Sequence, residues 1–363
     1  MKTAIVYDRV NKWGGAERVL LTLHDLFPDA PLYTSVYSFE KAPWAKVFPK
    51  VIPSFLNKIN FLRDKHEFLG ALMPLAFESF NFDDYDLVIS VSSEAAKGVI
   101  TKPQTKHICY CLTPTRYLWS HHDEYFKGLA FKVLTKPVVN YLRMWDKIAA
   151  QRPDVMLSIS KAVQERVTKY YDRDSLIIYP PVDTRNFKVQ DSKIKKEDYF
   201  LFVSRLVPYK KAGLAVEAFN NLGLPLVIIG AGSEEKKLRF LAKKNITFLK
   251  NLTDAELAHY YQNARSLIFP GEEDFGIVMV EAQAAGIPVV AYKKGGALDI
   301  ITEGKTGLFF DEQSSESLIQ AVRKLNKVKF IRENIVESTG KFSKEKFKKE
   351  FKKLVEETMG GKI

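Results

Sequence analysis

Two glutamates stand eight positions apart on either side of a glycine in the sequence EEDFGIVMVEAQAAGIP. Gly276 permits close approach of the backbone to a ligand, and the free amides of Ile277 and Val278, at the start of a predicted helix, attract anions. Glu273 precedes this turn, and Glu281 lies about one turn into the helix. Such a turn is suited to binding phosphate groups and sugar hydroxyls together.

A basic loop follows the apolar run that begins at Tyr199. Its sequence, SRLVPYKK, places Arg205 and Lys210 at the carboxyl end of a predicted strand, where parallel α/β sheets bind their ligands. Arg205 can bridge two phosphate oxygens with its planar fork, and Lys210 can supply a compact charge near a leaving oxygen. A solvated basic loop with no ligand is the alternative interpretation.

Two glycine pairs follow other predicted strands. Gly230-Ala-Gly232 lacks the third glycine and the later acidic residue of a dinucleotide site, so we expect a tight turn and no NAD. Gly14 and Gly15 come after the first strand and open a helix, which predicts a second set of amides able to bind an anion. An ordinary turn would explain this second pair equally well.

The chain has 363 residues, more than one hydrophobic core usually supports. Short apolar runs alternate with helical patterns, which is typical of parallel α/β sheets. Two prolines near Asp183 favour extended backbone and mark a boundary. We therefore predict two doubly wound domains, 1–183 and 184–341, followed by an amphipathic helix over 342–363. The predicted strands are Ala4–Tyr7, Leu87–Val91, His107–Leu112, Val155–Ile159, Tyr199–Ser204, Pro225–Gly230, Ile246–Leu249, Ser266–Phe269, Val289–Ala291 and Gly307–Phe310.

Together, the basic loop and the glutamate turn resemble the donor-site signature of the family 4 retaining glycosyltransferases. The resemblance covers nearly the whole chain and implies the GT-B fold, in which two Rossmann-like domains face each other across a cleft. It makes Arg205, Lys210 and Glu273 the catalytic candidates. The residues that it places around the donor are Gly14, Gly15, Arg205, Lys210, Glu273, Phe275, Gly276, Ile277, Val278 and Glu281.

The segment YCLTPTRYLW, which starts at Tyr110, resembles a branch of this family that includes O-antigen mannosyltransferases. That branch commonly has a histidine where this chain has Leu112, so a hydrogen bond to the donor sugar is expected to be missing. Arg116, Tyr117 and Trp119 are candidates for the acceptor side, because aromatic rings stack on sugar faces and arginine binds phosphate or sugar oxygens. An ordinary packed loop is the alternative.

The resemblance implies transfer of a hexose, with retention, from a sugar nucleotide to a hydroxyl of a growing polysaccharide or lipid-linked glycan. Our best guess for the donor is GDP-mannose, and a GDP-sugar is favoured over a UDP-sugar. No metal and no cofactor are expected. Two other functions stay open. The first is a catalytically silent partner of an active transferase, which is suggested by Leu112 at the position of the usual histidine. The second is a nucleotide-sugar epimerase of GT-B architecture.

Asp84 and Asp86 match the metal-binding Asp-x-Asp motif of another glycosyltransferase architecture. They directly precede an apolar strand, so we expect a solvated strand entrance there and no metal site.

The formal net charge is +12, and residues 323–363 hold 13 Lys and Arg against 6 Glu, a net of +7. With no nucleic-acid-binding motif, nucleic acid is excluded as a partner. We expect the tail helix to pack its apolar face on the protein and its lysines to permit reversible contact with an anionic membrane. The start MKTAIVYD has no signal-peptide pattern, and two cysteines form no disulfide framework, so a cytoplasmic location is expected, with the inner face of the membrane as a further site.

Overall fold

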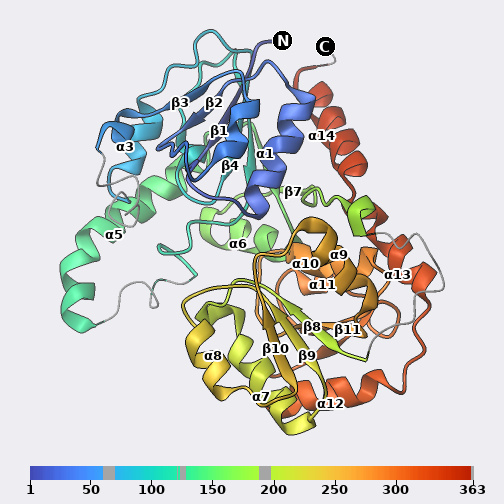
Figure 1. Ribbon diagram of the computed structural model, residues 1–363. Coiled ribbons are helices and arrows are strands. Elements are labelled where there is room, and N and C mark those ends of the chain that lie inside the picture. The colour runs from blue at the N-terminus through green and yellow to red at the C-terminus, as the bar shows by residue number, and fades with distance from the viewer. Residues whose placement is uncertain (60–69, 121, 123–127, 188–197, 361–363) are drawn as a thin grey trace. The chain divides into compact units, whose positions relative to one another are not determined.

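The computed structural model describes residues 1–59, 70–120, 122, 128–187 and 198–360 (Figure 1). These residues form two compact units. Domain 1 comprises Met1–Tyr179 together with the C-terminal segment from Phe347, and domain 2 comprises Pro180–Lys346. The predicted class, two doubly wound parallel-sheet domains, is confirmed.

Domain 1 is built on a seven-stranded sheet with the order β3-β2-β1-β4-β5-β6-β7. All its strand pairs are parallel, and β1 lies between β2 and β4. The sequence patterns identified four of these strands and missed β2, β3 and β7. The strands are β1 (Thr3–Tyr7), β2 (Leu32–Thr34), β3 (Val51–Pro53), β4 (Leu87–Ser92), β5 (Lys106–Cys111), β6 (Val155–Ser158) and β7 (Leu176–Ile177).

Local sequence signals set the ends of the domain 1 helices. Ser160, for example, caps α6 by accepting a hydrogen bond from the amide of Val163, and Asp172 ends α6 in the left-handed conformation. The helices are α1 (Gly15–Leu26), α3 (Met73–Glu78), α5 (Leu129–Ala149) and α6 (Lys161–Tyr171), with 3-10 helices η1 (Pro43–Val47), η2 (Phe55–Lys58) and η4 (Ala96–Gly98).

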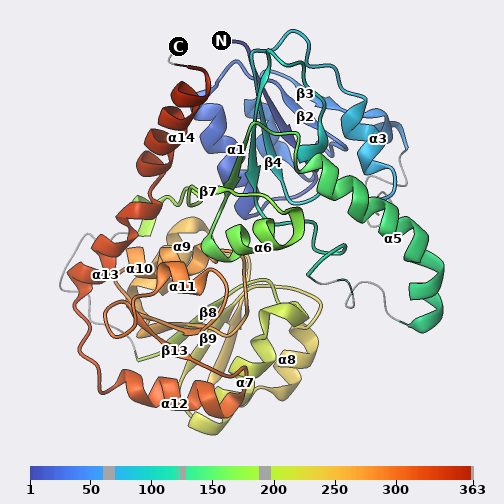
Figure 2. The same ribbon diagram turned by 180° about the vertical axis from the view of Figure 1, so that it is seen from behind.

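The C-terminal helix α14 (Lys344–Thr358) runs beside α1 in both views (Figures 1 and 2). Lys348 of α14 pairs with Asp25 of α1 at 2.7 Å, and Phe347 meets the ring of Tyr110 edge-on at 5.7 Å. The four apolar residues that recur at helical spacing are all buried. They are Phe347, Phe351, Leu354 and Val355.

Domain 2 is built on a six-stranded parallel sheet with the order β10-β9-β8-β11-β12-β13. All six of its predicted strands are present. The strands are β8 (Phe200–Val203), β9 (Leu226–Ile229), β10 (Ile246–Leu249), β11 (Ser266–Phe269), β12 (Val289–Tyr292) and β13 (Gly307–Phe310). The helices are α7 (Ala212–Leu222), α8 (Glu235–Leu241), α9 (Asp254–Asn263), α10 (Ile277–Ala284), α11 (Ala297–Ile300), α12 (Ser315–Leu325) and α13 (Arg332–Ser338), with 3-10 helices η5 (Thr184–Phe187), η6 (Pro208–Lys210) and η7 (Thr339–Phe342).

The core of domain 2 lies between this sheet and the helices α7, α8 and α12. Phe200 packs edge-to-face on Phe219 of α7 at 5.1 Å, and Leu318 and Val322 of α12 are fully buried in the same cluster. Within the described parts of the chain, no helix is both long and apolar enough to cross a bilayer.

Candidate functional site

The predicted donor residues of domain 2 lie together at one point of its sheet. Open parallel sheets bind ligands at the carboxyl ends of their strands, where the strand order reverses. In domain 2 the order reverses between β8 and β11. The loop after β8 carries Arg205 and Lys210, and the loop after β11 carries Glu273, Phe275 and Gly276. The fold therefore brings the two sequence signals together at the expected edge.

An ion pair joins the two loops. The Lys210 ammonium contacts a carboxylate oxygen of Glu273, 63 positions later in the chain, and both side chains are largely buried. Arg205 is exposed, and its guanidinium donates to the hydroxyl of Tyr209 at 2.7 Å. The Lys210 ammonium also lies 5.0 Å from the centre of the Tyr209 ring. Two cations thus share one loop, with Tyr209 contacting both.

The glycine turn ends at the start of α10. Gly276 has φ = +94°, a conformation that favours glycine, and a Cβ there would lie 2.4 Å from the end of the Met279 side chain. The residue before this helix, Gly276, has no side chain that could cap it, and amides at the start of a helix can donate to an anion. Ile277 and Val278 are half-buried in this first turn.

Glu281 is buried one turn into α10 and accepts a hydrogen bond of 2.9 Å from the hydroxyl of Tyr261 on α9. Phe275 is also buried and meets the ring of Phe342 edge-on at 5.4 Å. The sequence singled out Glu281 and Phe275 but gave no sign of Tyr261, whose hydroxyl fixes the orientation of the carboxylate. Only the order of the strands brings α9 next to α10.

Gly232 and Gly296 allow the backbone of neighbouring loops to pack closely against the two candidate donor loops. A Cβ at Gly232 would lie 2.2 Å from the carbonyl oxygen of Leu206, beside the basic loop. Gly296 donates its amide to the carbonyl oxygen of Glu273 at 2.8 Å. These close approaches explain Gly230-Ala-Gly232 as backbone packing, in agreement with the predicted tight turn.

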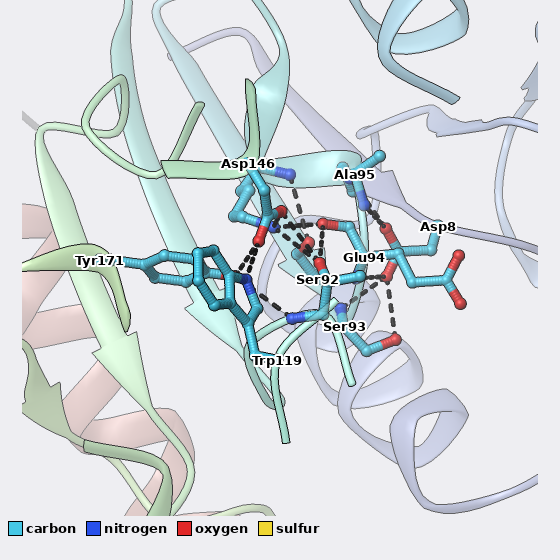
Figure 3. A network of polar contacts seen from close by, with 11 residues as sticks. Asp8, Ser92, Ser93, Glu94, Ala95, Trp119, Asp146 and Tyr171 are labelled. Carbon is cyan, nitrogen blue, oxygen red and sulfur yellow. Dashed lines mark hydrogen bonds and ion pairs between the residues drawn. The ribbon is translucent and has the colours of Figure 1, made fainter. Parts of the chain in front are cut away.

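The sheet of domain 1 reverses its order between β1 and β4, where the structure places a second ion pair. Arg9, after β1, pairs with Glu94, after β4, and both side chains are mostly buried. Burial raises the pKa of the Glu94 carboxyl above its ordinary value. Asp8 accepts hydrogen bonds of 2.6 to 3.0 Å from four successive amides, from Ser93 to Ala96, which fixes the turn after β4 (Figure 3).

Neither Arg9 nor Glu94 was found from the sequence, although each lies within three residues of the end of a predicted strand. A search for charged residues at the carboxyl ends of the first and fourth strands would have found them.

At the predicted amide site of Gly14 and Gly15, the carboxylate of Glu17 already occupies part of the space for an anion. Gly14 is the residue before α1, and the buried Glu17 carboxylate hydrogen-bonds to the amides of Gly14 and Glu17. Burial raises the pKa of Glu17, whose carboxylate also accepts a hydrogen bond of 2.9 Å from the hydroxyl of Tyr7. A ligand anion would have to displace Glu17 or bind beside it, and a donor role for these glycines stays a prediction.

Trp119, predicted on the acceptor side, belongs to a buried polar network centred on Asp146. The carboxylate of Asp146 pairs with the Lys97 ammonium at 2.5 Å and accepts from the Trp119 indole at 2.7 Å and from the Tyr171 hydroxyl at 2.9 Å (Figure 3). The Trp119 ring also stacks on Tyr170 at 5.2 Å. These contacts fix Trp119 in place and favour the packed-loop alternative for this residue.

Arg116 and Tyr117 are half-buried in the same loop. Burial raises the pKa of Tyr117, which lines a cavity of about 10 Å³ together with Glu94 and Asp146. That volume is about the size of one water molecule. Leu112 follows β5, donates its amide to the carbonyl oxygen of Ser92 at 2.8 Å, and offers no side-chain hydrogen bond. Acceptor binding by Arg116, Tyr117 and Trp119 stays a prediction.

Asp84 and Asp86 lie at the amino end of β4, opposite the edge that carries the candidate sites. Both are exposed, and Asp86 accepts a hydrogen bond of 2.6 Å from the amide of Lys2. Among the residues that the structure describes, no group of three His, Cys, Asp or Glu side chains could hold a metal ion.

Comparison with known proteins shows that residues 183–342 match the family described as glycosyl transferases group 1. The chain is 29% identical over 201 residues to the GDP-mannose-dependent alpha-(1-6)-phosphatidylinositol monomannoside mannosyltransferase of Mycobacterium tuberculosis, covering 47% of this chain and 52% of that protein. It is 25% identical over 227 residues to the O-antigen chain mannosyltransferase C of Escherichia coli, covering 58% and 59%. The chain spans about half the length of the curated relatives that it matches.

The fold is similar to that of solved structures over nearly the whole chain. The crystal structure of Anabaena HepE in complex with UDP matches with a TM-score of 0.75 and 18% identity, covering 98% of this chain and all of that one. Sucrose-phosphate synthase from Thermosynechococcus elongatus matches with a TM-score of 0.75 and 14% identity, covering 99% and 100%. These matches support the GT-B fold for both domains.

Proposed function

We propose that the protein is a retaining, metal-independent glycosyltransferase, because residues 183–342 match the family described as glycosyl transferases group 1. It would transfer a hexose from a sugar nucleotide to a hydroxyl of a growing polysaccharide or lipid-linked glycan. The observation that carries the proposal is the meeting of Arg205, the Lys210–Glu273 pair and the uncapped start of α10 at the point where the domain 2 sheet reverses its order.

The chemistry follows from these charges. The donor diphosphate binds between Arg205, Lys210 and the first amides of α10, which together offset the negative charge that grows on the leaving group. The bond between the anomeric carbon and the phosphate oxygen breaks, and a bond to the acceptor oxygen forms on the same face of the sugar. The departing phosphate oxygen takes the acceptor proton, so no metal and no further base are needed.

Glu273 takes part in donor binding because its carboxylate contacts the Lys210 ammonium before the donor binds. When a phosphate takes the place of Glu273 beside the ammonium, the carboxylate is released toward the transferred sugar and can accept its hydroxyl hydrogens. Glu281, oriented by Tyr261, accepts hydrogen bonds from the ribose hydroxyls. The two glutamates thus bind opposite ends of one donor.

The donor of our proposal is GDP-mannose, which is supported by the mannosyltransferases among the relatives. The UDP in HepE keeps a uridine nucleotide as the competing donor. We further propose that the protein acts in the cytoplasm at the inner face of a membrane, where lipid-linked acceptors are found.

Isothermal calorimetry with GDP-mannose, UDP-glucose and ADP-glucose tests this proposal directly. We expect GDP-mannose to bind at least tenfold more tightly than the other two, and binding to be lost in Lys210→Ala. Turnover should persist in EDTA. If no sugar nucleotide binds, the proposal is wrong. If activity is lost in EDTA and restored by Mn²⁺, the metal-independent mechanism is wrong.

One observation favours a second candidate function. The side chain of Leu112 can give no hydrogen bond at the position where the resembled branch commonly has histidine. A catalytically silent partner of an active transferase would tolerate that loss. In that case GDP-mannose binds in calorimetry, but the protein releases no GDP when lipid-linked acceptors from a membrane extract are added.

A further inference from the structure

Two tryptophan side chains of domain 1 lie together just before α1. The ring centres of Trp13 and Trp44 are 6.2 Å apart, and their planes are inclined by 59°. The indole of Trp44 donates a hydrogen bond of 2.8 Å to the carbonyl oxygen of Lys12, which ties η1 to the loop that carries Trp13. Trp44 is half-buried, whereas 54% of Trp13 is exposed. Trp44 is therefore held in place, and Trp13 presents an aromatic surface to solvent beside it.

This pair belongs to the carboxyl edge of the domain 1 sheet. Trp13 follows β1, and Trp44 lies in η1, which follows β2. The loops after these two strands run side by side, because the carbonyl oxygen of Val10 accepts a hydrogen bond of 2.9 Å from the amide of Ser38. Ligands of parallel α/β sheets bind at this edge. The exposed tryptophan thus lies where a ligand of domain 1 is expected.

Charged side chains lie beside the tryptophan pair on the same edge. Burial raises the pKa of the carboxyls of Glu17 and Glu94, and the positive charge of Lys12 opposes that rise in both. Lys12, the neighbour of Trp13, is thus close enough to act on the Arg9–Glu94 ion pair. Carboxylates accept hydrogen bonds, and ammonium and guanidinium groups donate them. An aromatic face next to such groups matches a sugar ring, which has an apolar face of C–H groups and a rim of hydroxyls.

The exposed area of Trp13 favours a sugar over a macromolecule. A tryptophan that is half exposed offers roughly 130 Å². A stable protein interface needs about 800 Å² on each partner. The exposed ring on the neighbouring loop, Phe39, already has the Lys46 ammonium 4.2 Å from its centre, and the exposed acid Glu40 follows it. The area is thus too small for a protein partner, and the acid disfavours an anionic lipid.

We propose that Trp13, backed by Trp44, is a stacking platform for a pyranose ring of the acceptor glycan. One face of the sugar packs on the Trp13 ring, and the charged side chains beside it hydrogen-bond to hydroxyls along the sugar's rim. The inference rests on the proposed function and sharpens it, because such a platform selects an acceptor that already carries sugars. The protein therefore extends a glycan, and a separate glycosyl transfer must attach the first sugar to the lipid.

The test measures binding of mannotriose and of maltotriose to the full chain by ligand-observed NMR, without a donor. We expect mannotriose to bind the wild type, and Trp13→Ala to bind it about tenfold more weakly because the sugar loses its stacking surface. Trp13→Phe keeps a smaller ring and should restore part of the affinity. The matched control is Phe39→Ala. It removes a ring that is 56% exposed but covered by Lys46, and it should bind as the wild type does.

The platform is wrong if neither trisaccharide binds the wild type, or if Trp13→Ala binds mannotriose as tightly as the wild type does. It is also wrong if Trp13→Ala leaves sugar binding intact and instead abolishes sedimentation with vesicles or breaks a dimer in solution. Transfer of mannose to a polyprenyl phosphate that bears no sugar would overturn the role in glycan extension.

Calorimetry with GDP-mannose on the wild type separates failure of the platform from failure of the proposed function. If GDP-mannose binds and neither trisaccharide does, only the platform is wrong. If a trisaccharide binds through Trp13 and no sugar nucleotide binds, the platform stands as a glycan-binding site and the proposed transferase activity is wrong.

Discussion

At the residue scale, Lys210 and Arg205 carry the charge of the candidate donor site, and they are held in different ways. Lys210 is largely buried beside Glu273, whereas Arg205 is exposed beside Tyr209. A buried cation with one carboxylate partner is already positioned when a phosphate arrives. An exposed arginine must be ordered by the ligand that it binds. We therefore expect the loss of Lys210 to affect turnover more than the loss of Arg205.

We predict that Lys210→Ala and Arg205→Ala each lower kcat/KM for the sugar nucleotide by one to several orders of magnitude. A charged hydrogen bond to a developing anion contributes about 1.5–3 kcal/mol, and often more in a protected site. Steady-state release of GDP measures the effect. Lys237→Ala, an exposed lysine on α8, serves as the control and should retain full activity. Normal turnover in both site variants would contradict the assignment.

A second residue-scale prediction concerns Tyr261, whose hydroxyl orients Glu281. Tyr261→Phe removes one hydrogen bond of about 1 kcal/mol without emptying the space that the ring fills. The dissociation constant for the donor should rise about fivefold, and kcat should change less. Calorimetry and kinetics together measure this split. Tyr260→Phe, on the same helix but packed against Tyr199, should leave both constants unchanged. If kcat instead falls about fivefold while the dissociation constant is unchanged, Tyr261 does not act through donor binding.

At the element scale, the sequence predicts the strands that carry the site and misses those at the two ends of the domain 1 sheet. Apolar runs identify ten strands, each four to six residues long in the structure, because burial on both faces demands such runs. The missed strands β2, β3 and β7 have three residues or fewer, too short for any pattern to stand out. β3 also ends in Pro53, which an edge strand tolerates and a sequence pattern rejects.

The same limit applies to the site. Lys210 and Glu273 were each predicted from their local motifs, but their pairing depends on β8 and β11 being neighbours. Lys97 and Asp146 were missed because a buried charge has no signature of its own in a sequence. They meet only when η4 and α5 pack together. Motifs therefore located the candidate donor site, whereas its supporting contacts needed the fold.

Lys97→Met tests the pair that joins η4 to α5. Burial alone would lower the pKa of the Lys97 ammonium, but the attraction and hydrogen bond of Asp146 outweigh burial and raise it. Removing the cation leaves Asp146 charged and buried, which costs about 3–5 kcal/mol. Urea unfolding followed by tryptophan fluorescence measures the loss, because all four tryptophans lie in domain 1.

The matched control for this variant is Lys102→Met, which breaks a pair with Asp83 that is half-exposed on both sides. An exposed pair contributes about 0–1 kcal/mol, so the control should unfold nearly as the wild type does. If Lys97→Met is as stable as the control, the network around Asp146 is not what holds α5 in place.

At the scale of the whole molecule, domain 1 holds buried groups whose protonation differs between the folded and unfolded chain. His107 of β5 is fully buried, with its ring 2.8 Å from the hydroxyl of Ser90. Burial lowers the pKa of this imidazole from 6.5 to about 3. Glu94 acts in the opposite sense, since its raised pKa lets the folded chain hold a proton that the unfolded chain releases. As the pH falls, His107 therefore lowers the stability of domain 1 and Glu94 raises it, and a variant can separate the two effects.

We predict that His107→Gln flattens the loss of domain 1 stability in acid. Because the folded imidazole stays neutral down to about pH 3, the unfolded chain binds one more proton as the pH falls below 6.5. The stability that His107 contributes is therefore complete above pH 6.5 and is lost toward pH 3, by at most about 1.4 kcal/mol per pH unit. Glu94 and the other carboxylates contribute equally to both proteins, so the difference between their slopes isolates His107. Urea midpoints read by tryptophan fluorescence between pH 7 and pH 4 give the two slopes.

The control variant is His259→Gln, which replaces an exposed histidine of domain 2 and should leave the slope unchanged. Equal slopes for the wild type and His107→Gln would show that the imidazole is protonated in the folded domain.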